Sequence, residues 1–521
     1  RQARSFLETK VVTHALDPHA SVLVVGAGVM GSGIAQLAAR HGHPVFLFDT
    51  RPQAASHAIQ AIQTDLARLV ERGKFTNNER AALLERLHPL ERLDEAREAQ
   101  LVVEAIVEDL ESKQAVLAAV EKIVSSDCLL TTNTSSISIN AIANALSSPE
   151  RLVGMHFFNP VPIMKLVEVI SGLKTDPSVA TAVFQTAQSW GKTAVHARST
   201  PGFIVNRIAR AFYAETLMLL QEQFASSEDI DLCLRAAGFR MGPCELMDLI
   251  GHDVNFAVTQ SVFTENFFDR RFTPSIVQKE LVDGGLFGRK SGKGFYSYPS
   301  QAERSSLSPL SPSADSTDTM GEITVHGSDP MAGRIADRLS EKGISFACHP
   351  ESHWSGIRAG ELDLRMTEGQ AASEIAAQEG IRNVAVFDWA PADRDAGPLA
   401  WACAIQSDDD SAKQAADLLR HLGFVPVQTK DYPGLIVART LSMIVNEAND
   451  AVLQGVCSKE DANAAMRFGA NYPAGPFDWQ NEWGAAQITN VLDSLNDFYR
   501  GERYRVSPGL RQAAWREHVK H

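Results

Sequence analysis

Short apolar runs alternate with longer amphipathic stretches along the first third of the chain. Ser21–Val25 and Pro44–Phe48 are apolar runs of strand length, and Ala54–Arg72 has the spacing of a helix that buries one face. The alternation continues through an expected helix at Leu110–Val124 and expected strands at Leu101–Val107, Cys128–Thr132, Gly154–Phe158 and Lys165–Ile170. This pattern predicts an α/β fold, with parallel strands and helical crossovers on both faces of the sheet.

The pattern changes near residue 200, where no further strand is expected. Ile204–Gln223 and Glu228–Ala237 are amphipathic with no strand-like run between them, so residues 200–298 are predicted to form an all-α domain. Residues 299–320 are rich in serine and proline, a composition typical of a linker between domains.

After the linker, the same two kinds of pattern occur again. Strand, helix and strand are expected at Ile323–His326, Met331–Lys342 and Asn383–Phe387, which predicts a degenerate Rossmann-like domain over residues 321–430. Pro201-Gly-Phe-Ile-Val-Asn-Arg207 recurs 232 positions later as Pro433-Gly-Leu-Ile-Val-Ala-Arg439, and Gly242-Pro243 recurs 233 positions later as Gly475-Pro476. A nearly constant offset indicates that residues 431–521 repeat the all-α domain.

Charge and composition exclude several classes of protein. The 521 residues carry a formal net charge of −14, so the chain is not expected to bind nucleic acid. No apolar run is long enough to cross a bilayer, and residues 1–20 lack the apolar core of a signal peptide, so they are expected to be a loose tail. The six cysteines are scattered without a CxxC pair, which favours neither disulfides nor a metal site and fits a reducing cytoplasm.

A glycine-rich segment follows the first expected strand and opens a helix expected at Ile34–His41. It reads Gly26-Ala-Gly28-Val29-Met30-Gly31. Gly26 would allow a tight turn, Gly28 would let the backbone approach a pyrophosphate, and Gly31 would let helix and strand pack closely. The segment therefore predicts a Rossmann-type NAD-binding domain over residues 21–199, with Val29 and Met30 beside the cofactor.

Asp49 ends the next expected strand, 23 residues after Gly26. A carboxylate there would accept hydrogen bonds from the adenosine ribose and repel a 2′-phosphate, which favours NAD over NADP. Arg51 points weakly the other way, since an arginine can neutralise that phosphate. Asp49 could instead cap a following helix.

His156 and Glu168 are ionisable groups within apolar segments. Glu168 lies in Lys165–Ile170, twelve residues after His156, and an isolated buried carboxylate is costly unless it meets a partner. If the two meet, the carboxylate fixes the imidazole tautomer and raises its basicity, as general acid–base catalysis requires. The alternative is a core histidine with an unrelated strand carboxylate.

These segments together resemble the 3-hydroxyacyl-CoA dehydrogenase family. The glycine turn, Asn133–Ser136, His156–Pro160 with Glu168, and Pro201–Arg207 occur in the family's order, over about residues 21–298. The duplicated second half is similar to the long bacterial members of phenylacetate catabolism, which act on 3-hydroxyadipyl-CoA, and more loosely to 3-hydroxybutyryl-CoA enzymes. The resemblance implies reversible NAD-dependent oxidation of an (S)-3-hydroxyacyl-CoA thioester to the 3-oxoacyl-CoA.

The resemblance also implies roles for individual catalytic residues. His156 would take the C3 hydroxyl proton as hydride leaves, Glu168 would orient it, and Asn159 would help to hold the pair. Ser135 and Asn206 would hydrogen-bond the substrate oxygen. Without the resemblance, Ser135 would be read as a turn or cap residue and Asn206 as a satisfied buried amide.

On the cofactor side, the resemblance implies that Glu108, Lys113 and Asn133 line the NAD site together with Asp49. The coenzyme A phosphates are harder to place, because Asp65 falls where the family has a serine. Arg72 and Lys74 are therefore only candidates for that contact.

The second half departs from the catalytic pattern. Ala438 replaces Asn206, no His…Glu pair precedes it, and Val325-His-Gly-Ser-Asp329 cannot form the glycine turn. The second half is therefore expected to be non-catalytic. Family members with a single all-α domain look like dimers formed through that domain, so residues 431–521 are expected to pack on 200–298 within one chain, while a homodimer through other surfaces stays open.

Two competing hypotheses remain at this stage. One is a different NAD oxidoreductase, acting on small β-hydroxy acids, but that chemistry typically relies on a lysine. The other is a non-catalytic NAD-binding regulatory protein, since this fold supports many roles.

Overall fold

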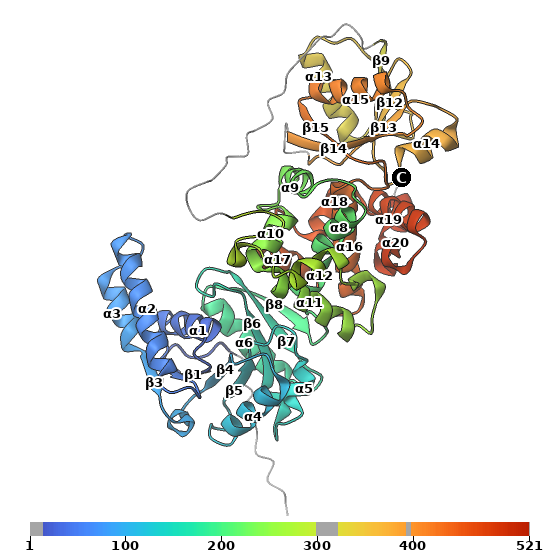
Figure 1. The fold of residues 1–521 in the computed structure, drawn as a ribbon. Helices are drawn as coiled ribbons and strands as arrows, with labels where there is room; N and C mark the ends of the chain where they lie inside the picture. The colour runs from blue at the N-terminus through green and yellow to red at the C-terminus, as the bar shows by residue number, and fades with distance from the viewer. Residues whose placement is uncertain (1–13, 299–320, 392–396, 520–521) are drawn as a thin grey trace, which may run out of the picture. The chain divides into compact units, whose positions relative to one another are not determined.

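The computed structural model describes residues 14–298, 321–391 and 397–519 (Figure 1). Most of the expected tail and the whole expected linker, residues 299–320, lie outside this part. The chain divides into two units, which are described separately: one holds the chain up to Arg207 together with Gln454–Ala470, and the other holds Ile208–Leu453 and the chain from Asn471. Among the described residues, no helix is both long and apolar enough to span a membrane.

The first unit is built on an eight-stranded sheet of order β3-β2-β1-β4-β5-β6-β7-β8. Its strands are β1 (Val22–Val25), β2 (Val45–Phe48), β3 (Leu87–Leu90), β4 (Leu101–Glu104), β5 (Leu129–Thr132), β6 (Leu152–Phe157), β7 (Leu166–Ser171) and β8 (Thr193–Arg198). Neighbouring strands are parallel, except that β6 and β7 are antiparallel. The expectation of a wholly parallel sheet was wrong here, because the short connection between β6 and β7 cannot hold a crossover helix.

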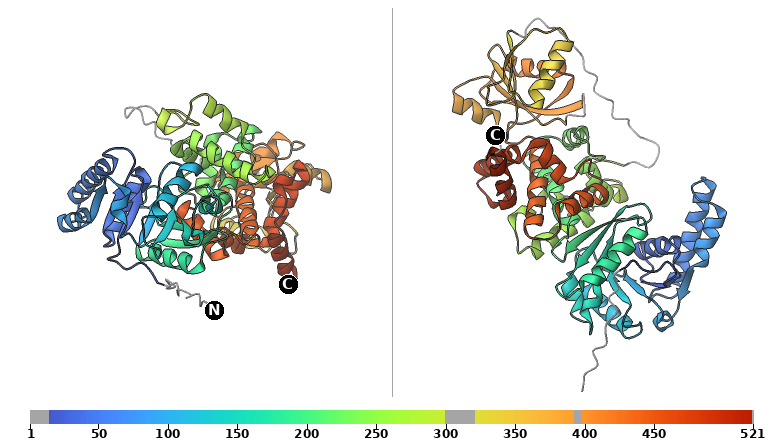
Figure 2. Two further views of the ribbon diagram at one scale, coloured as in Figure 1. Left: turned by 90° about the horizontal axis from the view of Figure 1, so that it is seen from below. Right: turned by 180° about the vertical axis from the view of Figure 1, so that it is seen from behind.

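Helices cover this sheet and set its boundaries. They are α1 (Val29–Arg40), α2 (Ala54–Glu71), α3 (Asn77–Glu85), α4 (Leu110–Glu121), α5 (Ile139–Ala143), α6 (Pro177–Ser189) and α7 (Val205–Ile208). The helix expected from Ile34 begins earlier, at Val29, because the glycine segment forms its first turn. Helices α2 and α3 lie side by side at the β3 edge of the sheet (Figure 2).

The first unit also contains a helix from the far end of the chain. Helix α17 (Lys459–Gly469) packs on β7 and β8. Residues 431–521 were expected to form one helical domain, but Gln454–Ala470 lie with the first sheet instead. The amphipathic pattern of α17 predicts that it buries one face, and does not indicate which surface covers that face.

The second unit combines a helical part with a second sheet. Its helices from the two repeats are α8 (Arg210–Gln221), α9 (Ser227–Ala236), α10 (Pro243–Ile250), α11 (His252–Glu265), α12 (Ile276–Asp283), α16 (Val437–Leu453), α18 (Pro476–Trp483), α19 (Ala485–Tyr499) and α20 (Pro508–Val519). Helix α8 packs on α16. Helix α16 is covered on all sides, since every residue from Val437 to Ala451 is buried.

The second sheet has seven strands in the order β10-β9-β11-β12-β13-β14-β15. These strands are β9 (Ile323–His326), β10 (Ala347–His349), β11 (Gly356–Ala359), β12 (Leu362–Met366), β13 (Val384–Phe387), β14 (Gly397–Cys403) and β15 (Phe424–Gln428), with helices α13 (Pro330–Glu341), α14 (Ala372–Glu379) and α15 (Asp409–His421). β13 and β14 are antiparallel and β14 and β15 parallel, which repeats the pairing of β6, β7 and β8. The last three strands of the two sheets therefore correspond.

Ion pairs between the two helical repeats of the second unit are reciprocal. Glu215 on α8 binds Arg503 at 2.7 Å, and Glu447 on α16 binds Arg271 at 2.9 Å. Glu447 lies 232 positions after Glu215, and Arg503 lies 232 positions after Arg271. Such an exchange of equivalent residues is the signature of an isologous, two-fold interface, found here within one chain. These ion pairs join residues of the two helical repeats within the second unit.

Candidate active site

The glycine turn leaves the N-terminus of α1 open. Gly26 has a φ of 107°, and a Cβ there would lie 2.4 Å from the carbonyl oxygen of Ala105. A Cβ at Gly31 would lie 1.8 Å from the oxygen of Gly26, whereas at Gly28 it would meet nothing within 4 Å. No side chain caps this helix, and Val29 is 75% exposed in its first turn. The open backbone N–H groups fit a dinucleotide pyrophosphate.

Asp49 is fixed at the edge of this turn. Its Oδ2 accepts a hydrogen bond from the N–H of Ala27 at 2.8 Å, and its Oδ1 accepts one from the Arg51 guanidinium at 3.0 Å. The Arg51 contact first, and the backbone N–H groups with it, lower the pKa of Asp49 to about 2. It does not cap α2, whose N-cap is Gln53. Asp49 is thus a fixed anion beside the open helix terminus.

The predicted residues Glu108, Lys113 and Ser135 form one cluster. Glu108 Oε1 accepts hydrogen bonds from the N–H groups of Ser135 at 2.8 Å and Ser136 at 3.0 Å, and from the Thr134 hydroxyl at 2.7 Å. Burial alone would raise the pKa of Glu108, but the nearby Lys113 charge and these hydrogen bonds outweigh it and lower that pKa. The cluster holds an anion under the turn that carries Ser135.

The sequence reasoning missed Glu104, a fully buried carboxylate at the end of β4. It binds the Lys113 ammonium at 2.8 Å, and Lys113 lies 3.3 Å from Glu108. Glu104 also accepts hydrogen bonds from the Thr132 hydroxyl and the Ile106 N–H. The signal was a carboxylate that ends an apolar run, the same signal that identified Glu168. Lys113 is therefore held by two carboxylates in this structure.

His156 and Glu168 face each other across the antiparallel pair β6 and β7. His156 Nδ1 lies 2.7 Å from Glu168 Oε2. The other oxygen of Glu168 accepts hydrogen bonds from the N–H groups of Ile204 and Val205, at 3.0 Å each. Glu168 is fully buried, and His156 is 6% exposed. The predicted meeting of the two side chains is present, because the register pairs them directly.

Two asparagines reach the same region and a third does not. Asn133 Oδ1 accepts a hydrogen bond from the Phe157 N–H at 2.8 Å, which ties the end of β5 to the strand that carries His156. Asn206 Nδ2 donates to the Ser135 carbonyl at 3.4 Å. Asn159 is exposed, and in the described part of the chain its side chain makes no hydrogen bond to the dyad. Within the set of predicted catalytic residues, Asn159 therefore stands apart.

Met30 and the candidate coenzyme A contacts occupy different environments. Met30 is half-buried and packs on the hydrophobic core of the first unit, unlike its exposed neighbour Val29. Arg72 and Lys74 are exposed just beyond α2, and the exposed Asp65 pairs with Arg68 at 3.2 Å. The structure gives these basic residues no specific site.

In the second half, carboxylates bind the backbone N–H groups that correspond to the open helix terminus and to the turn that holds Glu168 in the first half. Asp329 caps α13 and accepts hydrogen bonds from the N–H groups of Met331 at 2.8 Å and Ala332 at 2.9 Å. A pyrophosphate at that terminus would meet a negative charge instead of open donors. Asp388 accepts hydrogen bonds from the N–H groups of Ile436 at 2.9 Å and Val437 at 2.7 Å, the counterparts of the two that bind Glu168. Burial, the largest effect, raises the pKa of Asp388 to about 6.

Comparison with known protein families assigns nearly the whole described chain. The family model "3-hydroxyacyl-CoA dehydrogenase, NAD binding domain" matches residues 21–200, and "3-hydroxyacyl-CoA dehydrogenase, C-terminal domain" matches 202–298 and again 434–519. A third, "3-hydroxybutyryl-CoA dehydrogenase reduced Rossmann-fold domain", matches 364–433. The repeated match confirms the predicted duplication of the helical domain.

Individual relatives agree with these matches. The Escherichia coli (strain K12) protein named 3-hydroxyadipyl-CoA dehydrogenase is 43% identical over 95% of this chain and 97% of its own length. A crystal structure titled 3-hydroxybutyryl-CoA dehydrogenase from Escherichia coli K12 has a TM-score of 0.87 and 41% identity, and covers 97% of this chain and 100% of that chain. A probable 3-hydroxybutyryl-CoA dehydrogenase of Bacillus subtilis is 38% identical over 53% of this chain and 96% of its own. The resemblance seen in the sequence is confirmed, and the chain belongs to the 3-hydroxyacyl-CoA dehydrogenase family.

Proposed function

We propose that this chain catalyses the reversible NAD-dependent oxidation of an (S)-3-hydroxyacyl-CoA to the 3-oxoacyl-CoA, with His156 as the proton-transfer group. The observation that carries this proposal is the 2.7 Å contact between His156 and Glu168 in a member of this family. Bound NAD would supply the hydride acceptor. The open N-terminus of α1, with Gly28, Val29 and the fixed anion Asp49, would hold it.

The hydrogen bonds of Glu168 determine what His156 can do. Two backbone N–H groups donate to Oε1 of Glu168, which leaves Oε2 to accept the Nδ1–H of His156. Nε2 is left as the basic nitrogen. As the C3–H bond breaks and its electron pair leaves as hydride, the hydroxyl proton passes to Nε2 and the C3–O bond becomes a carbonyl. Reduction reverses each transfer.

The substrate oxygen needs hydrogen-bond donors on the side opposite to the base. Ser135 and Asn206 are the proposed donors, and the contact of the Asn206 amide with the Ser135 carbonyl brings them together. A neutral hydroxyl and an amide can both serve an oxygen that becomes more negative as its proton leaves. Asn159 is given no part in the proton transfer, since its exposed side chain makes no hydrogen bond to the dyad in the described part of the chain.

The acyl group is proposed to be the six-carbon dicarboxylic one, 3-hydroxyadipyl-CoA. The support is the E. coli relative of that name, which matches nearly the full length of both chains. The alternative, 3-hydroxybutyryl-CoA, rests on the name of the similar crystal structure.

A substrate panel tests this choice. Recognition of a distal carboxylate by a charge-assisted hydrogen bond is worth about 1.5–3 kcal/mol. We therefore expect kcat/KM for 3-hydroxyadipyl-CoA to exceed that for 3-hydroxybutyryl-CoA by roughly 10-fold or more. Preference for the butyryl thioester would reverse the substrate proposal. If neither thioester is turned over and NADH with acetoacetyl-CoA gives no turnover, a non-catalytic NAD-binding protein would be favoured.

Cofactor choice is expected to depend on Asp49. The native enzyme should prefer NAD to NADP by at least about tenfold, because a 2′-phosphate would approach a fixed carboxylate. Asp49→Ala should reduce that preference, and it also frees Arg51, whose guanidinium can then pair with the phosphate. The measurement is kcat/KM for both cofactors.

Asp94→Ala is the matched control, since Asp94 pairs with an arginine two positions away in the same way, at an exposed site. It should leave the cofactor ratio unchanged. Equal kcat/KM for NAD and NADP in the native enzyme would contradict the role proposed for Asp49.

We further infer that the second helical repeat takes the place of a partner subunit. The reciprocal pairs Glu215–Arg503 and Glu447–Arg271 support this, because a two-fold interface between separate chains would make the same contacts. A third pair follows the same rule: Arg207 lies 2.9 Å from Gln454 in the first unit, and the equivalent residues Arg439 and Glu222, each 232 positions away, lie 3.9 Å apart in the second.

A further inference from the structure

The segment 454–470, here called the α17 segment, belongs by sequence to the second helical repeat but packs in the first unit. It consists of the turn from Gln454 and helix α17, and it contacts the strands β7 and β8. β7 carries Glu168. The segment therefore covers the strand that carries one member of the candidate catalytic pair.

The end of α17 packs against the groups that hold Glu168. A Cβ at Gly469 would lie 2.5 Å from Leu166 Cδ2 and 3.0 Å from Val205 Cγ2. Leu166 lies two positions before Glu168 on the same strand, hence on the same face of the sheet. Val205 donates its N–H to Glu168 at 3.0 Å. Gly469 therefore lies against a residue of the strand that carries Glu168 and against a residue that donates its N–H to the Glu168 carboxylate.

The beginning of the α17 segment binds two arginines of the first unit, Arg198 and Arg207. Gln454 accepts a hydrogen bond from Arg207 at 2.9 Å, and the carbonyl of Val456 accepts one from the Arg198 N–H at 2.8 Å. Arg207 follows Asn206 directly. The α17 segment therefore contacts the turn Phe203–Arg207, which supplies both the N–H donors of Glu168 and the Asn206 amide.

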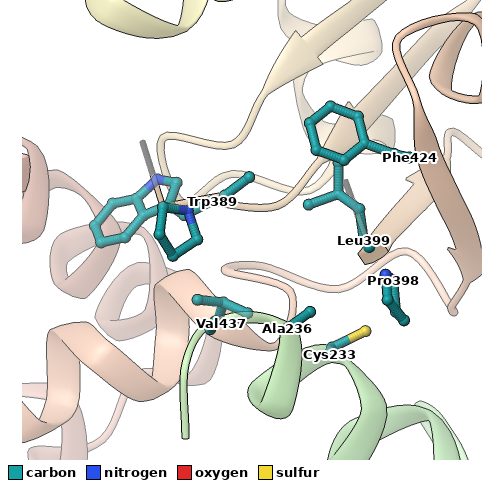
Figure 3. A pocket seen from close by; sticks show the side chains of 11 residues that line it. Cys233, Ala236, Trp389, Pro398, Leu399, Phe424 and Val437 are labelled. Carbon is teal, nitrogen blue, oxygen red and sulfur yellow. The ribbon is translucent and has the colours of Figure 1, made fainter. Parts of the chain in front are cut away.

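The second unit contains the reciprocal contact. Helix α9 of the first helical repeat packs on β14 of the second sheet, so each repeat covers the sheet of the other. Ala237, 232 positions before Gly469, stands at the equivalent place. There the contact leaves a partly open pocket of about 20 Å³, lined by Cys233, Ala236, Trp389, Leu399 and Phe424 among others (Figure 3). The catalytic side instead has a glycine and close contact.

We propose that the α17 segment is a positioning element for the catalytic pair, supplied to the active half by the otherwise non-catalytic second repeat. Gly469 is the positioning residue, because the absence of a side chain lets α17 approach Leu166 and Val205. The inference rests on the proposed roles of His156 and Glu168. This role explains why a repeat without its own dyad is retained. Without the α17 segment, Leu166 and Val205 would lose a packing contact, and with it the carboxylate that orients His156 would be held less firmly.

The test is Gly469→Ala in the full-length enzyme. Alanine favours a helix over glycine, so the change should not destabilise α17 itself. It should lower kcat by about three- to tenfold, less than the hundredfold that a misplacement of about 1 Å can cost, and leave KM for NAD unchanged. Gly333→Ala is the matched control: it lies inside helix α13 and its Cβ would meet nothing within 4 Å. That variant should keep the wild-type kcat.

A second change separates positioning from general damage. Leu166→Val removes Cδ2, the atom nearest to the new methyl group, so the double variant Gly469→Ala/Leu166→Val should regain most of the lost kcat. If Gly469→Ala does not fold, Gln454→Ala removes the bond to Arg207 and should lower kcat at constant KM for NAD.

Two outcomes overturn the proposal: a wild-type kcat in a folded Gly469→Ala or Gln454→Ala variant, or a loss of kcat that Leu166→Val does not relieve. In either case His156→Gln identifies which idea has failed. If that variant is inactive, only the positioning role is wrong. If it is fully active, the proposed catalytic pair is wrong as well.

Discussion

Replacement of His156 by glutamine should lower kcat by about 100-fold or more, the usual scale for loss of a general base. Glutamine keeps a polar side chain opposite Glu168 but offers no nitrogen that can take the hydroxyl proton at neutral pH. The glycine turn and Asp49 are untouched, so the affinity for NAD should change little. Pre-steady-state and steady-state rates of NADH formation, together with a direct NAD titration, measure the two effects separately.

Glu168→Gln should also lower kcat, because the imidazole loses the anion that fixes its tautomer. The control is His252→Gln, since His252 and Asp248 form another buried pair at 2.7 Å, in the second unit. That variant removes a buried histidine–carboxylate contact and should lower thermal stability while kcat stays near the wild-type value. If His156→Gln kept the wild-type kcat with chemistry shown to be rate-limiting, the dyad assignment would be wrong.

The sequence was sufficient to predict this pair because burial makes an ionised side chain conspicuous. Glu168 stands among Leu, Val and Ile, and twelve residues separate it from His156. The sequence did not predict the antiparallel pairing of β6 and β7, which places the two residues opposite each other. The same rule applied to the apolar run at Leu101 would have found Glu104, whose burial is offset by Lys113 and by hydrogen bonds from Thr132 and Ile106.

Other features depend on contacts between distant parts of the chain, for which local patterns carry no signal. The spacing of α17 shows that one face is buried, while its packing on β7 is a tertiary choice. The carboxylate Asp388 is similar, because nothing near it in sequence indicates that it caps a turn about 50 residues later. The repeat offset of 232 does predict these contacts once one member of each reciprocal pair is known.

A chain that ends at Tyr298 should aggregate or form a new dimer, and its activity should be lower than that of the full chain. Truncation removes Arg439 and Arg503, both bound at 2.7 Å to Glu215 on α8, so the chain loses the ion pairs that join the two repeats. It also uncovers the apolar face of α8 that packs on α16, and exposed faces of this size drive association. Light scattering coupled to gel filtration, with a turnover assay on each peak, measures both effects.

The activity of a dimer of truncated chains distinguishes loss of the α17 segment from loss of the packing surface alone. A new dimer of truncated chains could rebuild the two-fold contact, with Glu215 of each chain facing Arg271 of the other and α9 of each copy covering β7 of the other, as α9 covers β14 in the second unit. Ala237 directly follows α9 where α17 has Gly469, so such a dimer should be folded but have a lower kcat than the full chain, and co-expression with residues 321–521 should restore turnover. A truncated chain that is a clean, active monomer would show that the second repeat neither replaces a partner subunit nor supports the catalytic pair.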